Sequence, residues 1–261
     1  MKVVVTIAGS DSSGGAGIQA DLKTFEAFGV FGTSVITVAT AQNTQGVRAV
    51  EPFSPEFVKA QLEAVLDDFD VASIKIGMLY SKEIMKVVLE TIKQLDIPIV
   101  LNPVYISKAG SPLMKEEDGE FLKEFFEYVS VVTPNIYEAK KLFDYNASDS
   151  NSLQNIVNAK TAVLVKNVKL KLQSESFSTD QLFFKDETKV FQTPLLDSTN
   201  LHGTGCSYSS AICANLALGK KLKEAIAISK EFIYQAIKHA PSIGKGYGPI
   251  NHKKGIQCQK N

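Results

Sequence analysis

Two glycines flank a threonine directly before a cysteine in the segment LHGTGCSYSSAICANLALG at 201–219. After Gly205 the apolar residues recur with helical spacing, and Gly219 ends the pattern. The first amides of a helix lack intrahelical acceptors and carry the positive end of the helix dipole, and glycine lets a ligand approach the backbone closely. Gly203, Thr204 and Gly205 therefore predict a helix entrance that binds phosphate.

Cys206 falls in the first turn of this predicted helix. The field at a helix N-terminus lowers the pKa of a thiol and raises its thiolate fraction, which favours chemistry at Cys206. The alternative is a helix capped by Thr204 with a small buried cysteine at its start. Cys213 lies seven positions further on, roughly 10 Å along a helix axis and too far for a disulfide with Cys206.

The composition describes an ordinary globular chain. It has 261 residues, of which 44% are hydrophobic and 21% charged, enough to bury a large core. Lys plus Arg and Asp plus Glu both total 28, so no overall field favours nucleic acid or a membrane surface. Three cysteines without a C-x-x-C pair argue against a disulfide framework or a zinc site and for a reducing compartment. The N-terminus has no signal-peptide pattern and no segment is as long as a membrane span, so we expect a cytoplasmic protein.

Short runs rich in valine and isoleucine predict buried strands at 3–9, 34–40, 72–78, 98–104, 129–135 and 161–167. Amphipathic segments between them predict helices at 16–29, 55–69, 81–95 and 119–129, followed by helices at 204–218 and 221–238. Alternating strands and helices indicate a parallel sheet covered on both faces. The segment 174–195 predicts a hairpin at a sheet edge. We expect a single three-layer α/β/α domain over 1–261 with a mostly parallel central sheet.

Ligands bind beyond the carboxyl ends of the strands in such sheets, so the polar residues that follow each strand should converge in one crevice. The first of these segments, GSDSSGGAG at 9–17, does not match the dinucleotide fingerprint G-x-G-x-x-G, and no acidic residue follows the second strand to hold a ribose. A Walker A loop is also absent from the sequence. The glycine-rich segment therefore needs another explanation.

An ordered set of segments along the chain explains the glycine-rich segment. GSDSSGGAGIQADLKTF, TSVITVATAQNTQGV, IKIGML, TPNIYEA, AVLVK and HGTGC resemble, in order, the motifs of the ribokinase-like superfamily and, within it, of the hydroxymethylpyrimidine/phosphomethylpyrimidine kinases. The resemblance implies that ATP and Mg²⁺ serve the phosphorylation of 4-amino-5-hydroxymethyl-2-methylpyrimidine to the monophosphate and then to the diphosphate, in thiamine biosynthesis. It also implies a homodimer.

The pyrimidine pocket of the family corresponds to Gly9, Asp11, Ala16, Gln42, Met78 and Val104. A glutamine amide matches the acceptor nitrogen and amine donor of an aminopyrimidine edge, and a thioether can cover the ring face. The alternatives are a loop cap for Gln42 and a plain core position for Met78.

On the nucleotide side, the resemblance implies that Asn135 and Glu138 organise Mg²⁺ and that Lys166 contacts phosphate together with Thr204 and Gly205. The alternatives are a helix capping box for Asn135 and Glu138 and a solvated surface charge for Lys166. The backbone amides of Gly203 and Gly205 would neutralise charge on the transferred phosphoryl group, and Cys206 is the candidate base for the substrate hydroxyl.

Two segments depart from the family pattern. Asn102 stands where an aspartate is common, and Asn167-Val168-Lys169 stands where the family has two glycines and a histidine. Both changes predict weaker use of ATP with an intact pyrimidine pocket, because a carboxylate and close backbone approach are lost. A pyrimidine-binding protein with weakened kinase activity and a pyridoxal kinase therefore remain alternatives, and a sugar kinase fits less well.

Overall fold

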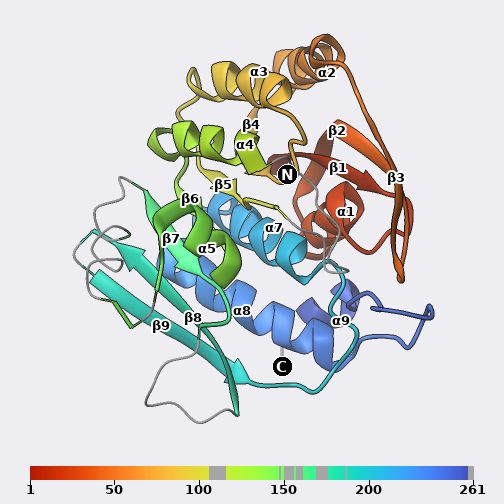
Figure 1. The fold of residues 1–261 in the computed structure, drawn as a ribbon, viewed down its shortest axis with the longest axis vertical. Coiled ribbons are helices and arrows are strands. Elements are labelled where there is room, and N and C mark those ends of the chain that lie inside the picture. Colours follow the sequence, from red (N-terminus) through yellow and green to blue (C-terminus); the bar gives the residue numbers. More distant parts are fainter. Residues whose placement is uncertain are drawn as a thin grey trace.

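The computed structural model describes residues 1–105, 116–146, 148–149, 156, 161–168, 176–185 and 187–257. Within these ranges the strands form one sheet in the order β3-β2-β1-β4-β5-β6-β7-β8-β9 (Figure 1). The strands are β1 (Val3–Asp11), β2 (Phe31–Asn43), β3 (Gly46–Pro52), β4 (Val71–Ile76), β5 (Ile99–Leu101), β6 (Val131–Val132), β7 (Ala162–Val165), β8 (Phe177–Phe184) and β9 (Glu187–Pro194). The pairings from β2 to β7 are parallel, and those that add β3, β8 and β9 are antiparallel.

Helices cover both faces of the sheet, which confirms the three-layer α/β/α architecture. The helices are α1 (Gly17–Ala27), α2 (Pro55–Asp68), α3 (Lys82–Ile92), α4 (Glu116–Gly119), the 3₁₀ helix η1 (Glu120–Glu127), α5 (Ile136–Phe143), α7 (Thr204–Ala217), α8 (Leu222–Lys238) and α9 (His252–Gln257). One hydrophobic core joins α2, α3, η1 and α5 to the sheet, and a second joins α1, α7 and α8 to its other face.

The strands form because their apolar runs fit a sheet that is buried on both sides. Val4 and Val5 are neighbours in β1, yet Val4 enters one hydrophobic core and Val5 the other. A strand covered on both faces needs apolar residues at consecutive positions rather than an alternating pattern. This explains why the continuous runs in the sequence predicted these strands correctly.

Helix α7 lies in the interior, packed against α1, α8 and the strands β1, β4 and β5. Its small residues Ser209, Ser210, Ala211 and Ala214 are all buried, and they allow close contact between the helix and its neighbours. The Ser73 hydroxyl of β4 donates a hydrogen bond of 2.9 Å to the backbone carbonyl of Cys213. The sheet therefore holds α7 along its length, and with it the helix entrance at 203–206.

Several sequence expectations differ from the structure, including the strand expected at 98–104, which spans only Ile99–Leu101. Strand β2 continues to Asn43 and forms a hairpin with β3, where the sequence suggested a loop. The helix expected at 119–129 is a 3₁₀ helix over Glu120–Glu127, the strand expected at 129–135 has only two residues, and the tail contains α9. Helices α1, α2, α3, α7 and α8 and the edge hairpin β8–β9 are confirmed.

Candidate active site

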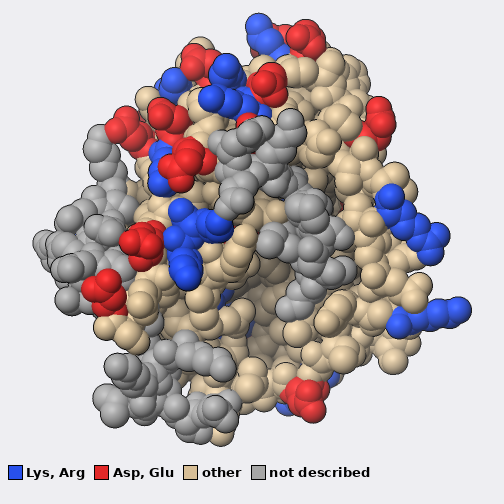
Figure 2. All heavy atoms as spheres, in the orientation of Figure 1, with Lys and Arg blue, Asp and Glu red and all other residues tan. Residues whose placement is uncertain are grey.

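A cavity of about 550 Å³ lies beyond the carboxyl ends of the parallel strands. Figure 2 shows a hollow near the middle of the viewed face. All the residues that the sequence assigned to the site line this one cavity: Gly9, Asp11, Ala16, Gln42, Met78, Val104, Asn135, Glu138, Lys166, Gly203, Thr204, Gly205 and Cys206. The structure thus brings the predicted pyrimidine and nucleotide residues together.

The helix entrance is built by Gly203, which has the left-handed φ of 81° and is the N-cap of α7. A Cβ at this position would overlap the backbone carbonyl of Gly15, so the loop at 11–16 approaches the head of α7 closely enough to require glycine here. A Cβ at Gly205 would instead stand 3.6 Å from Lys166 Nζ and 3.9 Å from Asn102 Nδ2. Gly205 therefore leaves open space toward the cavity rather than relieving a protein contact.

Thr204 is not the helix cap. Its hydroxyl donates to the carbonyl of Leu201 at 2.8 Å, and its amide points to the same carbonyl at 3.3 Å. The capping alternative for Thr204 is therefore wrong. Within the described ranges, the amides of Gly205 and Cys206 have no backbone acceptor, so they are available to an anion in the cavity.

Cys206 is partly exposed, at the start of α7. The expectation of a lowered thiol pKa is wrong, because burial raises the pKa of Cys206, with Lys75 opposing that rise. Loss of hydration penalises the thiolate more than the helix entrance and the nearby ammonium group favour it. Cys213 is fully buried next to Ser73, and burial raises its pKa to about 12.

Lys166 is 8% exposed and follows β7 directly, so the alternative of a solvated surface charge is wrong. Its Nζ donates a hydrogen bond of 3.1 Å to Asn102 Oδ1, and its amide donates to the carbonyl of Pro134. Burial lowers the pKa of Lys166 and Glu138 opposes this shift. Asn102, which replaces the aspartate common in the family, thus holds the lysine through an amide oxygen.

The capping box of Asn135 and Glu138 is present. The Glu138 amide donates to Asn135 Oδ1 at 2.9 Å, and the Asn135 amide donates to Glu138 Oε2 at 2.8 Å. Burial raises the pKa of Glu138, while Lys166 opposes the rise. Both residues line the cavity, so the structural role and a role near phosphate are compatible at the same positions.

The segment 167–169 differs from the family pattern in its residue types, but the backbone of Asn167 keeps a conformation that glycine commonly adopts. Asn167 has a φ of 57°, the left-handed conformation in which glycine is common and asparagine is tolerated. Its amide donates to Asp180 Oδ1 at 2.9 Å, and the amide of Val168 donates to the carbonyl of Thr179. Lys169 lies outside the described residues. Asn167 therefore keeps a glycine-like backbone conformation, while its side chain occupies space that a glycine would leave open; the predicted loss of close backbone approach stays a prediction.

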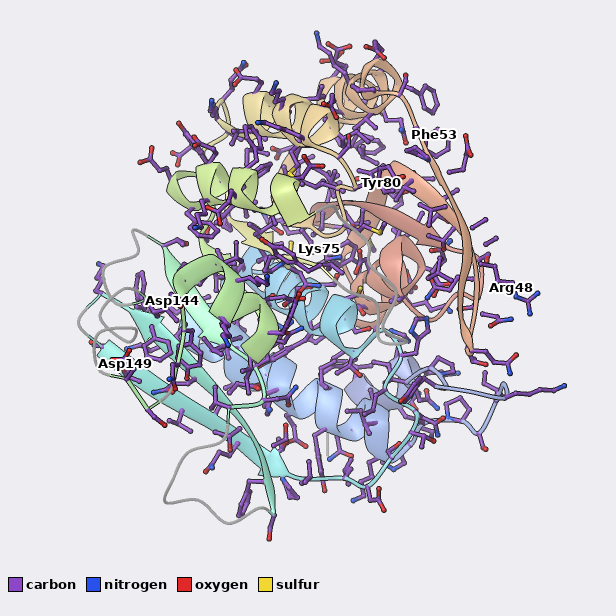
Figure 3. The ribbon with its side chains drawn as sticks, in the orientation of Figure 1. Arg48, Phe53, Lys75, Tyr80, Asp144 and Asp149 are labelled. Carbon is purple, nitrogen blue, oxygen red and sulfur yellow. The ribbon has the colours of Figure 1, made fainter. Side chains whose placement is uncertain are left out.

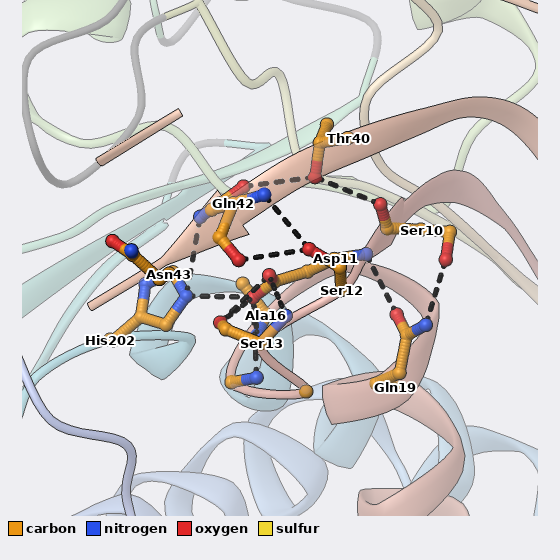
Figure 4. Close-up of polar contacts among 12 residues, drawn as sticks. Ser10, Asp11, Ser12, Ser13, Ala16, Gln19, Thr40, Gln42, Asn43 and His202 are labelled. Atoms are coloured by element: carbon orange, nitrogen blue, oxygen red, sulfur yellow. Dashed lines mark hydrogen bonds and ion pairs between the residues drawn. The ribbon is translucent and has the colours of Figure 1, made fainter. Parts of the chain in front are cut away.

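Figure 4 shows the polar network around Asp11, which lines the cavity. The Asp11 carboxylate accepts hydrogen bonds from Ser13, from the amides of Gly15 and Ala16, and from His202 Nε2 at 2.7 Å. Although burial alone would raise the pKa of Asp11, the hydrogen bonds from His202, Ser13 and Ala16 outweigh it and lower the pKa to about 2. Asp11 therefore joins the first strand loop to the entrance of α7.

Gln42 lies beside this network at the end of β2. Its Oε1 accepts from Thr40 Oγ1 at 3.2 Å, and its Nε2 lies 3.3 Å from His202 Nε2. In the described residues its side chain makes no hydrogen bond that caps the loop backbone, so the loop-cap alternative is wrong. Met78 is 9% exposed and Sδ would stand 3.4 Å from a Cβ at Gly9, which makes it a core residue with one edge in the cavity.

The sequence analysis missed several side chains of the cavity, among them Lys75, His202, Asp180 and Lys230. Lys230 Nζ pairs with Asp180 Oδ2 at 2.8 Å. Lys75 lies in the middle of the fold, whereas Arg48 points outward from the β3 edge (Figure 3). A lysine inside a strand that is buried on both faces needs a buried partner, so the segment ASIKIGM contained a signal for Lys75.

The described ranges contain no group of three or more His, Cys, Asp and Glu side chains suited to a metal. Mg²⁺, however, binds through one or two carboxylates and keeps several waters. The single carboxylate of Glu138 and the Asn135 amide, at the cavity wall near Lys166, fit such a water-rich site. Among the described helices, none is both long enough and apolar enough to cross a bilayer.

Comparison with known proteins agrees with this geometry. The family model described as phosphomethylpyrimidine kinase matches residues 11–251. A hydroxymethylpyrimidine/phosphomethylpyrimidine kinase of Haemophilus influenzae is 44% identical over 262 residues, covering 97% of both chains. The ADP complex of Bacillus subtilis pyridoxal kinase superposes with a TM-score of 0.86 at 32% identity, over 97% of this chain and 98% of the other.

The phosphomethylpyrimidine kinase from Clostridium difficile has a TM-score of 0.74 at 40% identity, over 91% of this chain and 100% of the other. These solved structures confirm the ribokinase-like fold that the motifs implied. The sequence identity of 44% and the coverage of 97% show that the similarity includes the sequence as well as the fold, over nearly the whole chain. The chain belongs to the phosphomethylpyrimidine kinase family.

Proposed function

We propose that this protein transfers the γ-phosphoryl group of ATP to the hydroxymethyl group of 4-amino-5-hydroxymethyl-2-methylpyrimidine and then to the monophosphate. The observation that carries the proposal is the shared cavity. Gln42 and Met78 line it together with Lys166, and the amides of Gly205 and Cys206, which also line it, are free. The family membership and the printed name of the Haemophilus influenzae relative support the same reaction.

The pyrimidine would bind between the first strand loop and the end of β2. The Gln42 amide offers both a donor and an acceptor to an aminopyrimidine edge, and the Met78 thioether covers a ring face. Gly9, Ala16 and Val104 would form the walls. The Asp11 carboxylate, whose oxygens accept several protein donors, would hold the wall in place.

Phosphate would bind at the head of α7, which Gly203, Thr204 and Gly205 form, where the amides of Gly205 and Cys206 are free and Lys166 supplies a cation. Asn135 and Glu138 would hold Mg²⁺ through its waters. When bound, Mg²⁺ neutralises phosphate charge. Positioning and charge neutralisation provide most of the catalysis in phosphoryl transfer, so these residues would carry most of the rate enhancement.

Cys206 would act as the general base. Its thiolate accepts the proton of the substrate hydroxyl while the hydroxyl oxygen bonds to the γ-phosphorus and the bond from phosphorus to the ADP oxygen breaks. Because burial raises the pKa of this thiol, the thiolate fraction and the rate should rise as the pH increases through that pKa. The second phosphorylation needs no such base, because the acceptor is an already ionised phosphate oxygen.

A kinetic experiment with the purified protein tests the reaction and the base together. ATP turnover is measured with the hydroxymethylpyrimidine, its monophosphate, pyridoxal or no acceptor. We expect turnover with both pyrimidines, and a Cys206→Ala loss of about 10²- to 10⁴-fold in kcat for the first phosphorylation but a much smaller loss for the second. Cys206→Asp should recover part of the rate with a pH profile shifted to lower pH, whereas Cys213→Ala, the control, should match the parent.

The outcomes separate the alternatives. A kcat/KM for pyridoxal above that for the pyrimidine would instead establish a pyridoxal kinase. The structural similarity to the Bacillus subtilis pyridoxal kinase is the reason for including this acceptor. Pyrimidine binding without turnover would establish a binding protein with weakened kinase activity. A Cys206→Ala rate within a few-fold of the parent for both acceptors would show that Cys206 is not the base.

The same proposal includes three general properties. The chain would act as a single kinase domain over 1–261, as a homodimer and in the cytoplasm. Sedimentation of the purified protein and the distribution of a tagged chain between cell fractions test the last two.

A further inference from the structure

A buried ion pair lies behind the base. Lys75 Nζ of β4 stands 2.7 Å from Asp21 Oδ2 of α1, and both side chains are fully buried. Asp21 also accepts hydrogen bonds from Thr6 Oγ1 at 2.6 Å and from Ser210 Oγ at 2.7 Å. The residues that surround this carboxylate therefore come from β1, β4 and α7, the elements that meet beneath the cavity.

The ion pair and Cys206 are linked through α7 and the cavity wall. Ser210 follows Cys206 by one helical turn, so the two side chains share a face of α7, and Ser210 contacts the partner of Lys75. Lys75 and Cys206 both line the cavity. A Cβ at Gly77 would stand 2.7 Å from Lys75 Nζ, so the absent side chain of Gly77 leaves room for the ammonium group.

The ammonium group also retains hydrogen-bonding capacity. An ammonium has three donors, and across the described part of the chain Asp21 is the one acceptor that contacts Lys75. Burying a charged pair is costly, and a fold could fill this position with apolar side chains. Because Lys75 and Cys206 line the same cavity, a function for this buried charge at the Cys206 thiol would account for the cost.

We propose that Lys75 is a positioning residue for the kinase reaction: its ammonium group stabilises the Cys206 thiolate, and Asp21 limits that stabilisation. The proposal builds on the base role of Cys206 for its kinetic consequence but not for its ionisation. The titratable groups around Lys75 are Asp21 from α1, Cys206 and Cys213 from α7, and Lys166 beyond β7. Lys75 favours the thiolate of Cys206, and Asp21 disfavours it.

The opposite signs provide the test. The rate of Cys206 alkylation by iodoacetamide is followed by mass spectrometry from about pH 7 to pH 10, in a Cys213→Ala, Cys258→Ser background. We expect Lys75→Met to slow alkylation at neutral pH by about tenfold, equivalent to a pKa rise of about one unit. Asp21→Asn should accelerate alkylation by a similar factor. A purely structural role would shift both variants in the same direction.

Several controls keep the test decisive. Lys220→Met removes an exposed ammonium that pairs with Glu224 and should leave the alkylation profile unchanged. If Lys75→Met does not fold, the neutral double variant Lys75→Met/Asp21→Asn replaces it. In that case the proposal still requires that Asp21→Asn alone accelerates the alkylation of Cys206. An unchanged profile in Asp21→Asn, or a shift of the same sign in both single variants, would overturn the proposal.

The kinetic consequence distinguishes this inference from the proposed function. Lys75→Met should lower kcat with the hydroxymethylpyrimidine and leave the step on the monophosphate within a few-fold, as expected for an effect through the base. If alkylation shifts as expected but kcat does not, Lys75 controls the Cys206 thiol and Cys206 is not the base. If kcat falls without an alkylation shift, the inference about Lys75 fails while the kinase function stands.

Discussion

Replacing Asp11 with asparagine should destabilise the protein in a pH-dependent way. In the structure, Asp11 Oδ2 accepts hydrogen bonds from the amides of Gly15 and Ala16 and from His202. Asparagine has one side-chain oxygen in place of two, so its NH₂ group would take the place of either Oδ1 or Oδ2 and would face hydrogen-bond donors there. The substitution therefore removes a charged acceptor that joins the first loop to the entrance of α7.

The pKa gives the size of the effect. Lowering the pKa of Asp11 from 3.8 to about 2 corresponds to about 2.5 kcal/mol, at about 1.36 kcal/mol per pH unit. Because water in the cavity screens part of this interaction, we expect about 1–2 kcal/mol. The folded-state pKa is the lower one, so the stabilisation is fully present above the unfolded-state pKa and is lost as the pH falls from about 4 to about 2.

Urea denaturation at several pH values measures this effect. The free energy of unfolding of Asp11→Asn should be about 1–2 kcal/mol lower than that of the parent at about pH 6, and the difference should narrow between about pH 4 and pH 3. Asp68→Asn, a change at an exposed end of α2, provides the control and should show little difference at any pH. A deficit that stays constant down to pH 3, or no deficit at pH 6, would refute the account of Asp11.

Three further predictions address the cavity. Gln42→Ala should weaken binding of the pyrimidine by about 1–3 kcal/mol, because ligand groups lose their partners; unchanged affinity in calorimetry would remove Gln42 from the site. Asn102→Asp should raise turnover or ATP affinity and leave pyrimidine affinity nearly unchanged, as kinetics and calorimetry would show; no improvement would mean that Asn102 does not limit nucleotide use. Gly203→Ala should lower the free energy of unfolding by about 2 kcal/mol or more, because its Cβ would meet Gly15 in addition to the strained backbone. Gly219 has the same φ of 81°, but a Cβ there would have no atom within 4 Å. Gly219→Ala is therefore the control, and thermal denaturation should show only the backbone cost of about 1–2 kcal/mol. Equal losses of stability in the two glycine variants would show that the contact with Gly15 does not contribute.

The sequence predicted most of the sheet because its strands are continuous apolar runs, a signal that does not depend on distant contacts. The capping box of Asn135 and Glu138 was equally local and is present. Strand β3 was missed because GVRAVEP is an edge strand, with Arg48, Ala49, Glu51 and Pro52 exposed and no buried face to give it a pattern. Such a strand is specified by its antiparallel pairing to β2.

The site residues were found where a motif marked them and missed where only tertiary contacts do. Lys75 and Asp21 are 54 positions apart, and His202 and Asp11 are 191 positions apart, so no local pattern joins either pair. The pKa of Cys206 was predicted in the wrong direction for the same reason. The helix entrance that lowers it can be predicted from the sequence, whereas the burial that raises it depends on neighbours from other elements.

The position of α7 in the interior has a consequence for biosynthesis. Strands β1, β4 and β5, against which α7 packs, end at Leu101, whereas α7 and the helix α8 that packs against it continue to Lys238. At about 5–20 residues per second, translation of the intervening segment takes on the order of 7–27 s. During that interval α1 packs on β1, but the part of this face that α7 covers in the folded protein stays exposed, which makes the nascent protein a substrate for chaperones. Native folding therefore has to wait for nearly the whole polypeptide, and a chain that terminates before α7 would expose this face permanently and aggregate.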